Sequence, residues 1–282
     1  QHINVVKIGG NVIDNADALA RFIDDFAQLP APKILIHGGG KLATRLSEKL
    51  EIPTQMIEGR RVTDRQTLDV VTMVYAGLIN KQVVAGLQAV GCNAIGLCGA
   101  DGNVIKASRR APVKVEISPE EAAASPAAAN MTPCEEAGFQ MVDYGFVGDV
   151  KAENVNAQFI YSLLERGIVP VFNAINHDGE GNLLNTNADS VASAVAMGLA
   201  RKYEVELVFT LDKAGVLLDV NDDSSLIPSI TPALYEELRS ADRIHSGMIP
   251  KIDNAYKTIE AGVASVRITS PDNLTGGTVV TK

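Results

Sequence analysis

Two glycine-rich segments, each placed directly after a short apolar run, are the first candidates for chemistry. They are KIGG at Lys7–Gly10 and HGGGK at His37–Lys41. Glycines let an anion approach backbone N–H groups closely, and a following helix adds the positive end of its dipole. Neither segment has the spacing of the GxxxxGK[ST] phosphate loop or of the dinucleotide motif GxGxxG. Each alone is also compatible with a tight turn, but together they favour an anion site.

Two lysines stand where a purely structural lysine is not favoured. Lys7 falls inside an apolar strand, where a snorkelling side chain is the alternative explanation. Lys251 falls in the first turn of a helix that begins at Pro250, although the helix dipole favours acidic residues there. This conflict indicates a bound anion that the lysine helps to neutralise.

The later half of the chain adds two polar segments, NTNADS at Asn185–Ser190 and LDKAGV at Leu211–Val216. Asn187 and Asp189 also fit the common role of helix caps. The sequence alone leaves both readings open.

Composition restricts the class of protein. The 282 residues are 46% apolar and 21% charged, which is typical of a globular protein with a substantial core. A net charge of -9 and 5% aromatic residues argue against a nucleic-acid or anionic-membrane surface. The three cysteines and four histidines show no metal-ligand spacing, so we expect no protein-held metal. With no secretory signal, and apolar runs that we judge too short to span a bilayer, we expect a cytoplasmic protein.

The elements that must position these residues alternate between β-branched apolar runs and helical stretches. This pattern predicts an α/β fold with a mostly parallel sheet covered on both faces. We expect strands at Ile3–Ile8, Lys33–His37, Asn93–Cys98, Ile168–Ile175, Val205–Leu211 and, closing the chain, Ser265–Thr269. We expect helices at Ala16–Leu29, from the HGGGK segment through Lys49, and at Thr67–Val90, about Asn154–Arg166, Asn187–Lys202, Pro232–Ser240 and Met248–Gly262.

One stretch, Ile117–Gly138, breaks this alternation. It is rich in alanine, and Pro119, Pro126 and Pro133 forbid one continuous helix. We interpret it as a surface excursion between two hairpin strands, and as a tolerated insertion in preference to a mobile lid.

Six motifs in one order and spacing carry a resemblance over essentially the whole chain apart from that excursion. They are KIGG, HGGGK, GRRVTD (Gly59–Asp64), NTNADS, LDKAGV and SGMIPKI (Ser246–Ile252). In these motifs the chain resembles the amino acid kinase family, and within it the enzymes that phosphorylate N-acetylglutamate in arginine biosynthesis. The resemblance implies an open αβα sandwich and a homodimer. Residues 1–175 would bind the acylglutamate and form the dimer, and residues 176–282 would bind ATP with Mg²⁺.

The resemblance also implies a role for each matching residue. Lys7 and Lys251 would flank the transferring phosphoryl group, with Asp189 orienting both lysines. The acceptor-binding residues would be Gly39, Gly40, Arg61 and Asn185. The nucleotide-binding residues would be Gly9, Gly10, Asp212, Lys213 and Gly215.

The expected chemistry is consistent with these residue types. Phosphoryl transfer to a carboxylate brings two anions together, so positive charge and N–H groups are needed more than a base. The acceptor carboxylate is already ionised at neutral pH. The lack of a catalytic His or Cys motif therefore fits.

Several alternatives stay open at this level. Arg60, next to Arg61, is either a solvated side chain or a second cation for a longer acyl group, which would make the acceptor N-succinylglutamate. Aspartate, glutamate, carbamate and uridylate kinases of the same superfamily are alternatives, and a non-catalytic amino-acid or nucleotide sensor is the alternative outside enzymes. Lys7 already lies in the first strand, so the extra helix of arginine-inhibited relatives is not expected, and we predict a dimer that arginine does not inhibit.

Overall fold

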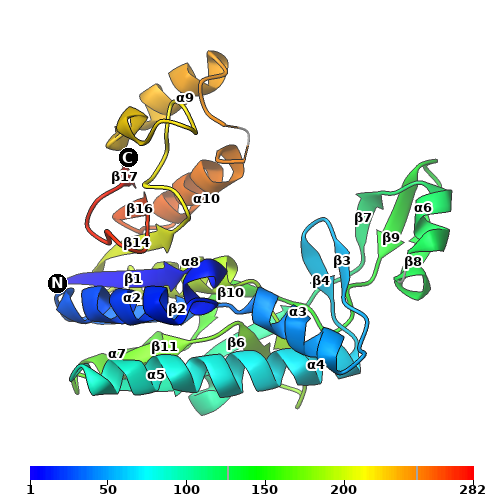
Figure 1. Cartoon of the computed structure of the whole chain (residues 1–282), viewed down its shortest axis with the longest axis horizontal. Helices are drawn as coiled ribbons and strands as arrows, with labels where there is room; N and C mark the ends of the chain where they lie inside the picture. The colour runs from blue at the N-terminus through cyan, green and yellow to red at the C-terminus, as the bar shows by residue number, and fades with distance from the viewer. Residues whose placement is uncertain (126, 246) are drawn as a thin grey trace.

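The computed structural model describes residues 1–125, 127–245 and 247–282, and its centre is an eight-stranded sheet (Figure 1). Pro126 and Ser246, which the sequence analysis used, lie outside the described residues. The strand order is β15 (Ser229–Ile230), β17 (Thr278–Val280), β16 (Ser265–Thr269), β14 (Glu204–Thr210), β1 (His2–Ile8), β2 (Lys33–His37), β11 (Val169–Phe172) and β5 (Ala94–Leu97). Neighbouring strands from β16 to β5 are parallel, and β17 runs antiparallel to β16.

Helices cover both faces of this sheet because alternate side chains of the central strands point to opposite sides. In β1, Ile3 and Val5 belong to one buried cluster, and Val6 and Ile8 belong to the other. The first cluster is closed by α7 (Ala157–Leu164), α8 (Ala188–Leu199), α9 (Pro232–Ser240) and α10 (Ile249–Glu260). The second is closed by α1 (Gly10–Ile13), α2 (Ala16–Gln28), α3 (Gly40–Lys49) and the run of α4 (Arg65–Thr72), η1 (Met73–Ile79) and α5 (Asn80–Ala89). The predicted open αβα sandwich is confirmed.

The carboxyl ends of the central strands meet at one edge of the sheet. Lys7 of β1 is level with Phe209 of β14, and Ile8 is level with His37 of β2. Both glycine-rich segments follow directly, so they open at the same edge, which is where parallel α/β sheets bind ligands.

The run Arg65–Ala89 is one continuous helix whose middle turns, η1, are π-helical. It has 25 residues, and an 18-residue window of it has a mean hydropathy of 1.4, so by length and composition alone it could cross a membrane, which corrects our expectation that every apolar run is too short. The expectation treats the apolar runs separately and does not consider that one helix continues through η1. In the fold, this helix packs against α2 and β5 as part of the second core cluster.

Three smaller sheets surround the main one. One consists of β10 (Gly148–Val155), β6 (Ile105–Arg109), β12 (Ile175–His177) and β13 (Leu183–Asn185), and another is the hairpin of β3 (Gln55–Ile57) and β4 (Arg60–Val62). The third consists of β7 (Val113–Glu116), β9 (Phe139–Val142) and β8 (Met131–Pro133). Short helical turns are η2 (Asp101–Asn103), η3 (Ala128–Asn130) and η4 (Asp223–Ser225).

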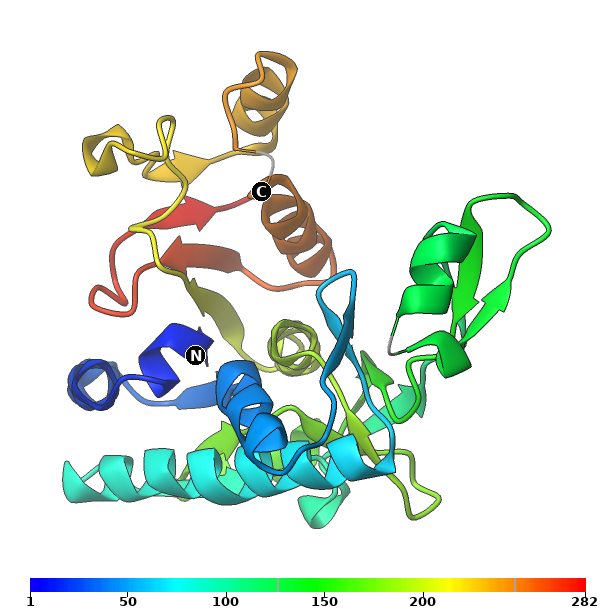
Figure 2. The same ribbon diagram turned by 45° about the vertical axis from the view of Figure 1, so that its right-hand side comes forward.

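The excursion at Ile117–Gly138 lies between β7 and β9, which pair antiparallel, so its predicted place between hairpin strands is confirmed. It carries α6 (Pro119–Ala124), which begins with a capping box at Ser118, and also β8. The unit formed by residues 113–142, here called the β7–β9 subdomain, projects from the main body beside the β3–β4 hairpin (Figures 1 and 2). A third apolar cluster joins them, with Ile57 and Val62 of the hairpin packed with Val142 and Tyr144.

Three expected boundaries are wrong. Helix α7 begins at Ala157 and not near Asn154, because β10 continues to Val155 and the Asn156 side chain caps the helix. The strand expected at Ile168–Ile175 stops at Phe172, where the Asn173 side chain bonds the Ile175 N–H at 2.9 Å and β12 then begins. Ser265–Thr269 does not close the sheet, since β17 follows it.

Candidate active site

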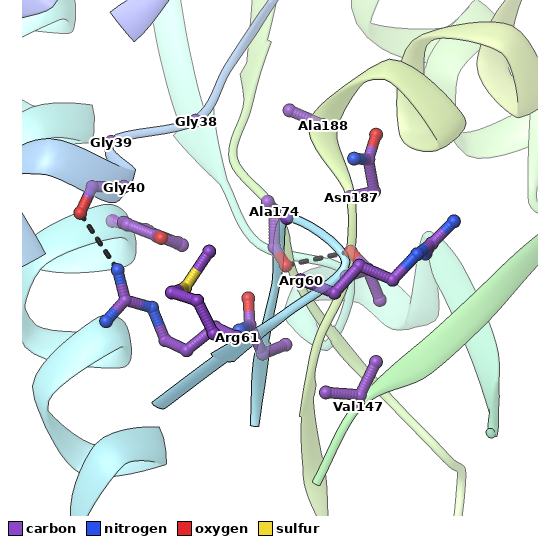
Figure 3. Close-up of a pocket in the computed structure, with 14 residues that line it drawn as sticks. Gly38, Gly39, Gly40, Arg60, Arg61, Val147, Ala174, Asn187 and Ala188 are labelled. Atoms are coloured by element: carbon purple, nitrogen blue, oxygen red, sulfur yellow. Dashed lines mark hydrogen bonds between the residues drawn. The ribbon is translucent and has the colours of Figure 1, made fainter. Parts of the chain in front are cut away.

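A cavity of about 230 Å³ lies at the carboxyl edge of the sheet (Figure 3). Its walls are the glycine loop Gly38–Gly40, the β3–β4 hairpin with Arg61, and the segment Asn185–Ala188. We call it the arginine cavity. Three residues with predicted acceptor roles, Gly39, Gly40 and Arg61, are thereby brought together with the fourth, Asn185.

Arg61 is the buried cation of this cavity, with 8% of its surface exposed. Its Nη2 donates to the Gly40 carbonyl at 3.0 Å and to Thr44 Oγ1 at 2.8 Å, so β4 and the start of α3 hold it from two sides. Within the described ranges, no carboxylate lies within ion-pair distance of its guanidinium. A buried charge without a counter-charge is unfavourable, so the cavity is suited to an anionic ligand.

A hydrogen-bonded link connects Arg61 to Asn185. Asn185 Nδ2 donates to Thr63 Oγ1 at 3.1 Å, and that hydroxyl donates to the Arg61 carbonyl at 3.1 Å. The hairpin and strand β13 are therefore fixed relative to each other at the floor of the cavity.

A second cavity, of about 330 Å³, adjoins the first, and we call it the lysine cavity. Asp189, Lys251 and Asn254 line it, and Arg60 and Asn187 line both cavities. Figure 3 shows the Arg60 and Arg61 side chains pointing to opposite sides of the hairpin, as expected for neighbours in a strand. The two cavities thus meet at Arg60 and Asn187.

Lys7 joins the lysine cavity through Asp189. Lys7 Nζ lies 2.8 Å from Asp189 Oδ1, and the lysine side chain is only 16% exposed. Asp189 lines the lysine cavity, whereas Lys7, near the end of β1, is not among the described residues that line either cavity. Two of the three residues with predicted catalytic roles, Asp189 and Lys251, thus line one cavity, and the third, Lys7, is connected to it by its ion pair with Asp189.

Three helix N-termini open onto the two cavities. Gly40 begins α3, Ala188 begins α8, and Pro250 stands in the first turn of α10. Each N-terminus presents the positive end of a helix dipole, although the Asn187 side chain already accepts from the Asp189 and Ser190 N–H groups at the start of α8. With Arg61 and Lys251, these ends make the edge attractive to more than one anionic group.

The predicted nucleotide residues are placed less centrally. Asp212 accepts a hydrogen bond from Asn11, which in turn accepts one from Lys41, so this carboxylate is tied to the glycine loop. Gly9 donates its N–H to Thr210 Oγ1 at 3.2 Å. Among the residues that the structure describes, none of the five predicted nucleotide residues lines either cavity. They are Gly9, Gly10, Asp212, Lys213 and Gly215.

Sequence reasoning missed two polar residues of the site. Tyr75, from the π-helical segment, lines the arginine cavity, and Asn254 of α10 lines the lysine cavity. Burial raises the pKa of Tyr75, and the nearby Arg61 guanidinium partly opposes that rise. Asn254 lies three residues after Lys251, a spacing that places both on one helix face. This spacing could have identified Asn254 from the sequence.

No group of three or more metal-ligating side chains occurs in the described part of the chain.

Known proteins resemble this chain over nearly its whole length. Residues 2–270 match the model of the amino acid kinase family. The chain is 47% identical to an acetylglutamate kinase of Cytophaga hutchinsonii, covering 97% of this chain and 93% of that one. It is 46% identical to an acetylglutamate kinase of Phocaeicola vulgatus, covering 100% and 99%. Among solved structures, smu.665 from Streptococcus mutans superposes with a TM-score of 0.70 at 28% identity, over 99% of this chain and 98% of that one.

Proposed function

The chain belongs to the amino acid kinase family, and from this premise we propose that it transfers the γ-phosphoryl group of ATP to the γ-carboxylate of N-acetylglutamate. The observation that carries the proposal is the buried Arg61, which forms no ion pair with another described residue, next to a second cavity lined by Lys251 and by Asp189, the ion-pair partner of Lys7. Two adjoining sites for anions are what a transfer between two anions requires.

In this proposal the acceptor occupies the arginine cavity. Arg61 binds its α-carboxylate, and Asn185 contacts the acylated amide. The γ-carboxylate then points past the N–H groups of Gly39 and Gly40 towards the lysine cavity. Such fixed donors lower the cost of holding two anions in line.

The transfer itself moves no proton. One γ-carboxylate oxygen attacks the γ-phosphorus, the bond from that phosphorus to the β,γ-bridging oxygen breaks, and ADP leaves with that electron pair. Lys7 and Lys251 offset the charge on the transferring group, and Asp189 orients the lysines. ATP enters as its Mg²⁺ complex, so the metal belongs to the substrate.

The remaining expectations stay proposals. We assign acceptor binding to residues 1–175 and nucleotide binding to residues 176–282, with Asp212, Lys213, Gly215, Gly9 and Gly10 on the nucleotide side. We also propose a cytoplasmic homodimer.

Arg60 favours a second candidate acceptor, N-succinylglutamate. It lies at the junction of the cavities and makes no ion pair with another described residue. A free cation there would stabilise the extra carboxylate of a succinyl group. Arg60→Ala is expected to lower kcat/KM for the succinyl substrate more than for the acetyl one. Equal losses for both would remove this candidate.

The test is ADP release from MgATP with N-acetylglutamate, N-succinylglutamate, glutamate, aspartate and uridylate compared in one assay. We expect turnover with an acylglutamate only. Preference for a free amino acid or for uridylate would contradict the proposal, and ATP binding without any turnover would indicate a sensor.

A further inference from the structure

His37 is a fully buried histidine at the end of β2 that the proposed chemistry does not use. Its ring lies between the glycine loop and the long helix. Nδ1 lies 2.8 Å from the Gly38 carbonyl oxygen, and Nε2 lies 3.1 Å from Asn80 Nδ2. A buried imidazole with a partner on both nitrogens has a defined orientation.

The partners of Asn80 determine which nitrogen of His37 carries the proton. Asn80 Nδ2 also donates to the Val171 carbonyl at 3.0 Å, and its Oδ1 accepts from Lys81 Nζ at 3.0 Å. The amide therefore presents its N–H₂ group to His37, so Nε2 must accept. The Gly38 carbonyl can only accept, so Nδ1 must donate. Both ends specify the neutral ring with its proton on Nδ1.

The same bond fixes the next peptide group. The Gly38–Gly39 peptide is trans, so the Gly39 N–H points away from the Gly38 carbonyl. With that carbonyl turned to the buried imidazole, the Gly39 N–H points away from His37, and Gly38, Gly39 and Gly40 all line the arginine cavity.

The π-helical segment η1 brings the supporting residues to one side. Tyr75 and Asn80 are five residues apart, which is about one turn when hydrogen bonds run from i to i+5. In an α-helix the same spacing would separate them by roughly 140°. A Cβ added at Gly39 would overlap Ile79 Cδ1 and lie 3.0 Å from Tyr75 Cδ1, and Gly39 has a positive φ of 154°.

We propose that His37, held by Asn80, is a positioning residue that aims the Gly39 N–H at the oxygens of the reacting carboxylate and phosphoryl group. The inference rests on the proposed function, because it assigns the donor to that reaction. A donor that is strongest in the transition state raises kcat with little effect on KM. The π-helical turn is the part of the fold that makes the arrangement possible.

The experiment compares His37→Phe, His37→Asn and Asn80→Leu with wild-type enzyme under saturating MgATP. His37→Phe keeps a ring but loses the donor, and we expect kcat to fall at least about tenfold while the acceptor KM stays within about twofold. His37→Asn keeps an N–H near the Nδ1 position and should recover part of that loss. Asn80→Leu tests the second contact in case His37→Phe does not fold.

The matched control is Lys33→Met, at the other end of the same strand. Lys33 is 5% exposed and donates to the carbonyls of Ala27 and Leu29, so this variant also loses buried hydrogen bonds. It should lose stability and keep kcat. Equal losses of kcat in Lys33→Met and the His37 variants would show a general structural effect and overturn the proposal.

A second readout is the ¹⁵N spectrum of the imidazoles, in which the signal missing from the His37 variant identifies this residue. We expect the neutral form protonated on Nδ1. The opposite tautomer, or unchanged kcat in His37→Phe and Asn80→Leu, would contradict the positioning role alone. A wild-type enzyme that turns over no acceptor would contradict the proposed function, and the positioning role with it.

Discussion

Lys7 and Asp189 form an ion pair of 2.8 Å between the end of β1 and the first turn of α8. These residues are 182 positions apart in the chain (189 minus 7) and meet only because both elements reach the carboxyl edge of the sheet. The pair joins the centre of the sheet to a helix that lines both cavities.

The first prediction concerns this pair. Lys7→Ala and Asp189→Asn should each lower kcat on the order of 10²-fold, because they remove or misdirect a charge next to the transferring group. Steady-state ADP release measures the effect. Lys202→Ala, which breaks a 2.7 Å surface pair with Glu165, is the matched control and should leave kcat unchanged. A similar fall in all three variants would argue against a local role for the pair.

Arg61 is expected to determine acceptor binding. Arg61→Gln removes a buried charge that donates to three oxygen atoms, of Gly40, Thr44 and Thr54, and hydrogen bonds to charged groups are worth about 1.5–3 kcal/mol. The acceptor KM should rise about 10- to 100-fold while the ATP KM changes little. Arg45→Gln serves as control, since Arg45 is half-exposed and pairs with Asp14. A rise in the ATP KM with an unchanged acceptor KM would show that Arg61 binds ATP and would contradict this prediction.

The β7–β9 subdomain should act on the acceptor through the β3–β4 hairpin. Val142 is fully buried in the cluster that contains Ile57 and Val62, so Val142→Ala leaves a small cavity against the hairpin. We expect a higher acceptor KM and an unchanged ATP KM.

Val113→Ala is the control for that prediction. Val113 pairs with Val142 across β7 and β9, but it is 39% exposed. If the two variants have the same acceptor KM as wild type, the subdomain does not support the hairpin.

His37 also predicts a pH dependence of stability. Burial lowers the pKa of His37 to about 4 from 6.5, and nearby Lys81 adds to the fall. Between pH 6.5 and about 4, His37 is therefore protonated in the unfolded chain but neutral in the folded chain. The free energy of unfolding should decrease as the pH falls through this range. Urea unfolding at pH 7.5 and pH 5, with His37→Asn as reference, measures it. An equal decrease in the variant would assign the effect to other groups.

Much of the fold and part of the site could be predicted from sequence for identifiable physical reasons. Short, nearly continuous apolar runs predicted β1 and β2, and the glycines after them indicated the binding edge. Lys251 was detectable because a cation conflicts with the helix dipole. The roles assigned to these residues stay predictions.

The rest depends on tertiary contacts that no local pattern encodes. Nothing in the residues 67–90 distinguishes a π-helical turn from an α-helical one, so the contact between Asn80 and His37 was not foreseen. Strand β10 runs to Val155 because it pairs with β6, which overrides the helical pattern at Asn154. Strand β17 is short and was missed for the same reason, since pairing with β16 defines it.

The most direct test of the central claim is to identify the product. Enzyme, MgATP and N-acetylglutamate are incubated with hydroxylamine, which traps an acyl phosphate as a hydroxamate, and mass spectrometry locates it. The account predicts one hydroxamate per ADP, on the γ-carboxyl group, and none with Lys7→Ala. ADP formed without a hydroxamate, or a hydroxamate on the α-carboxyl group, would contradict it.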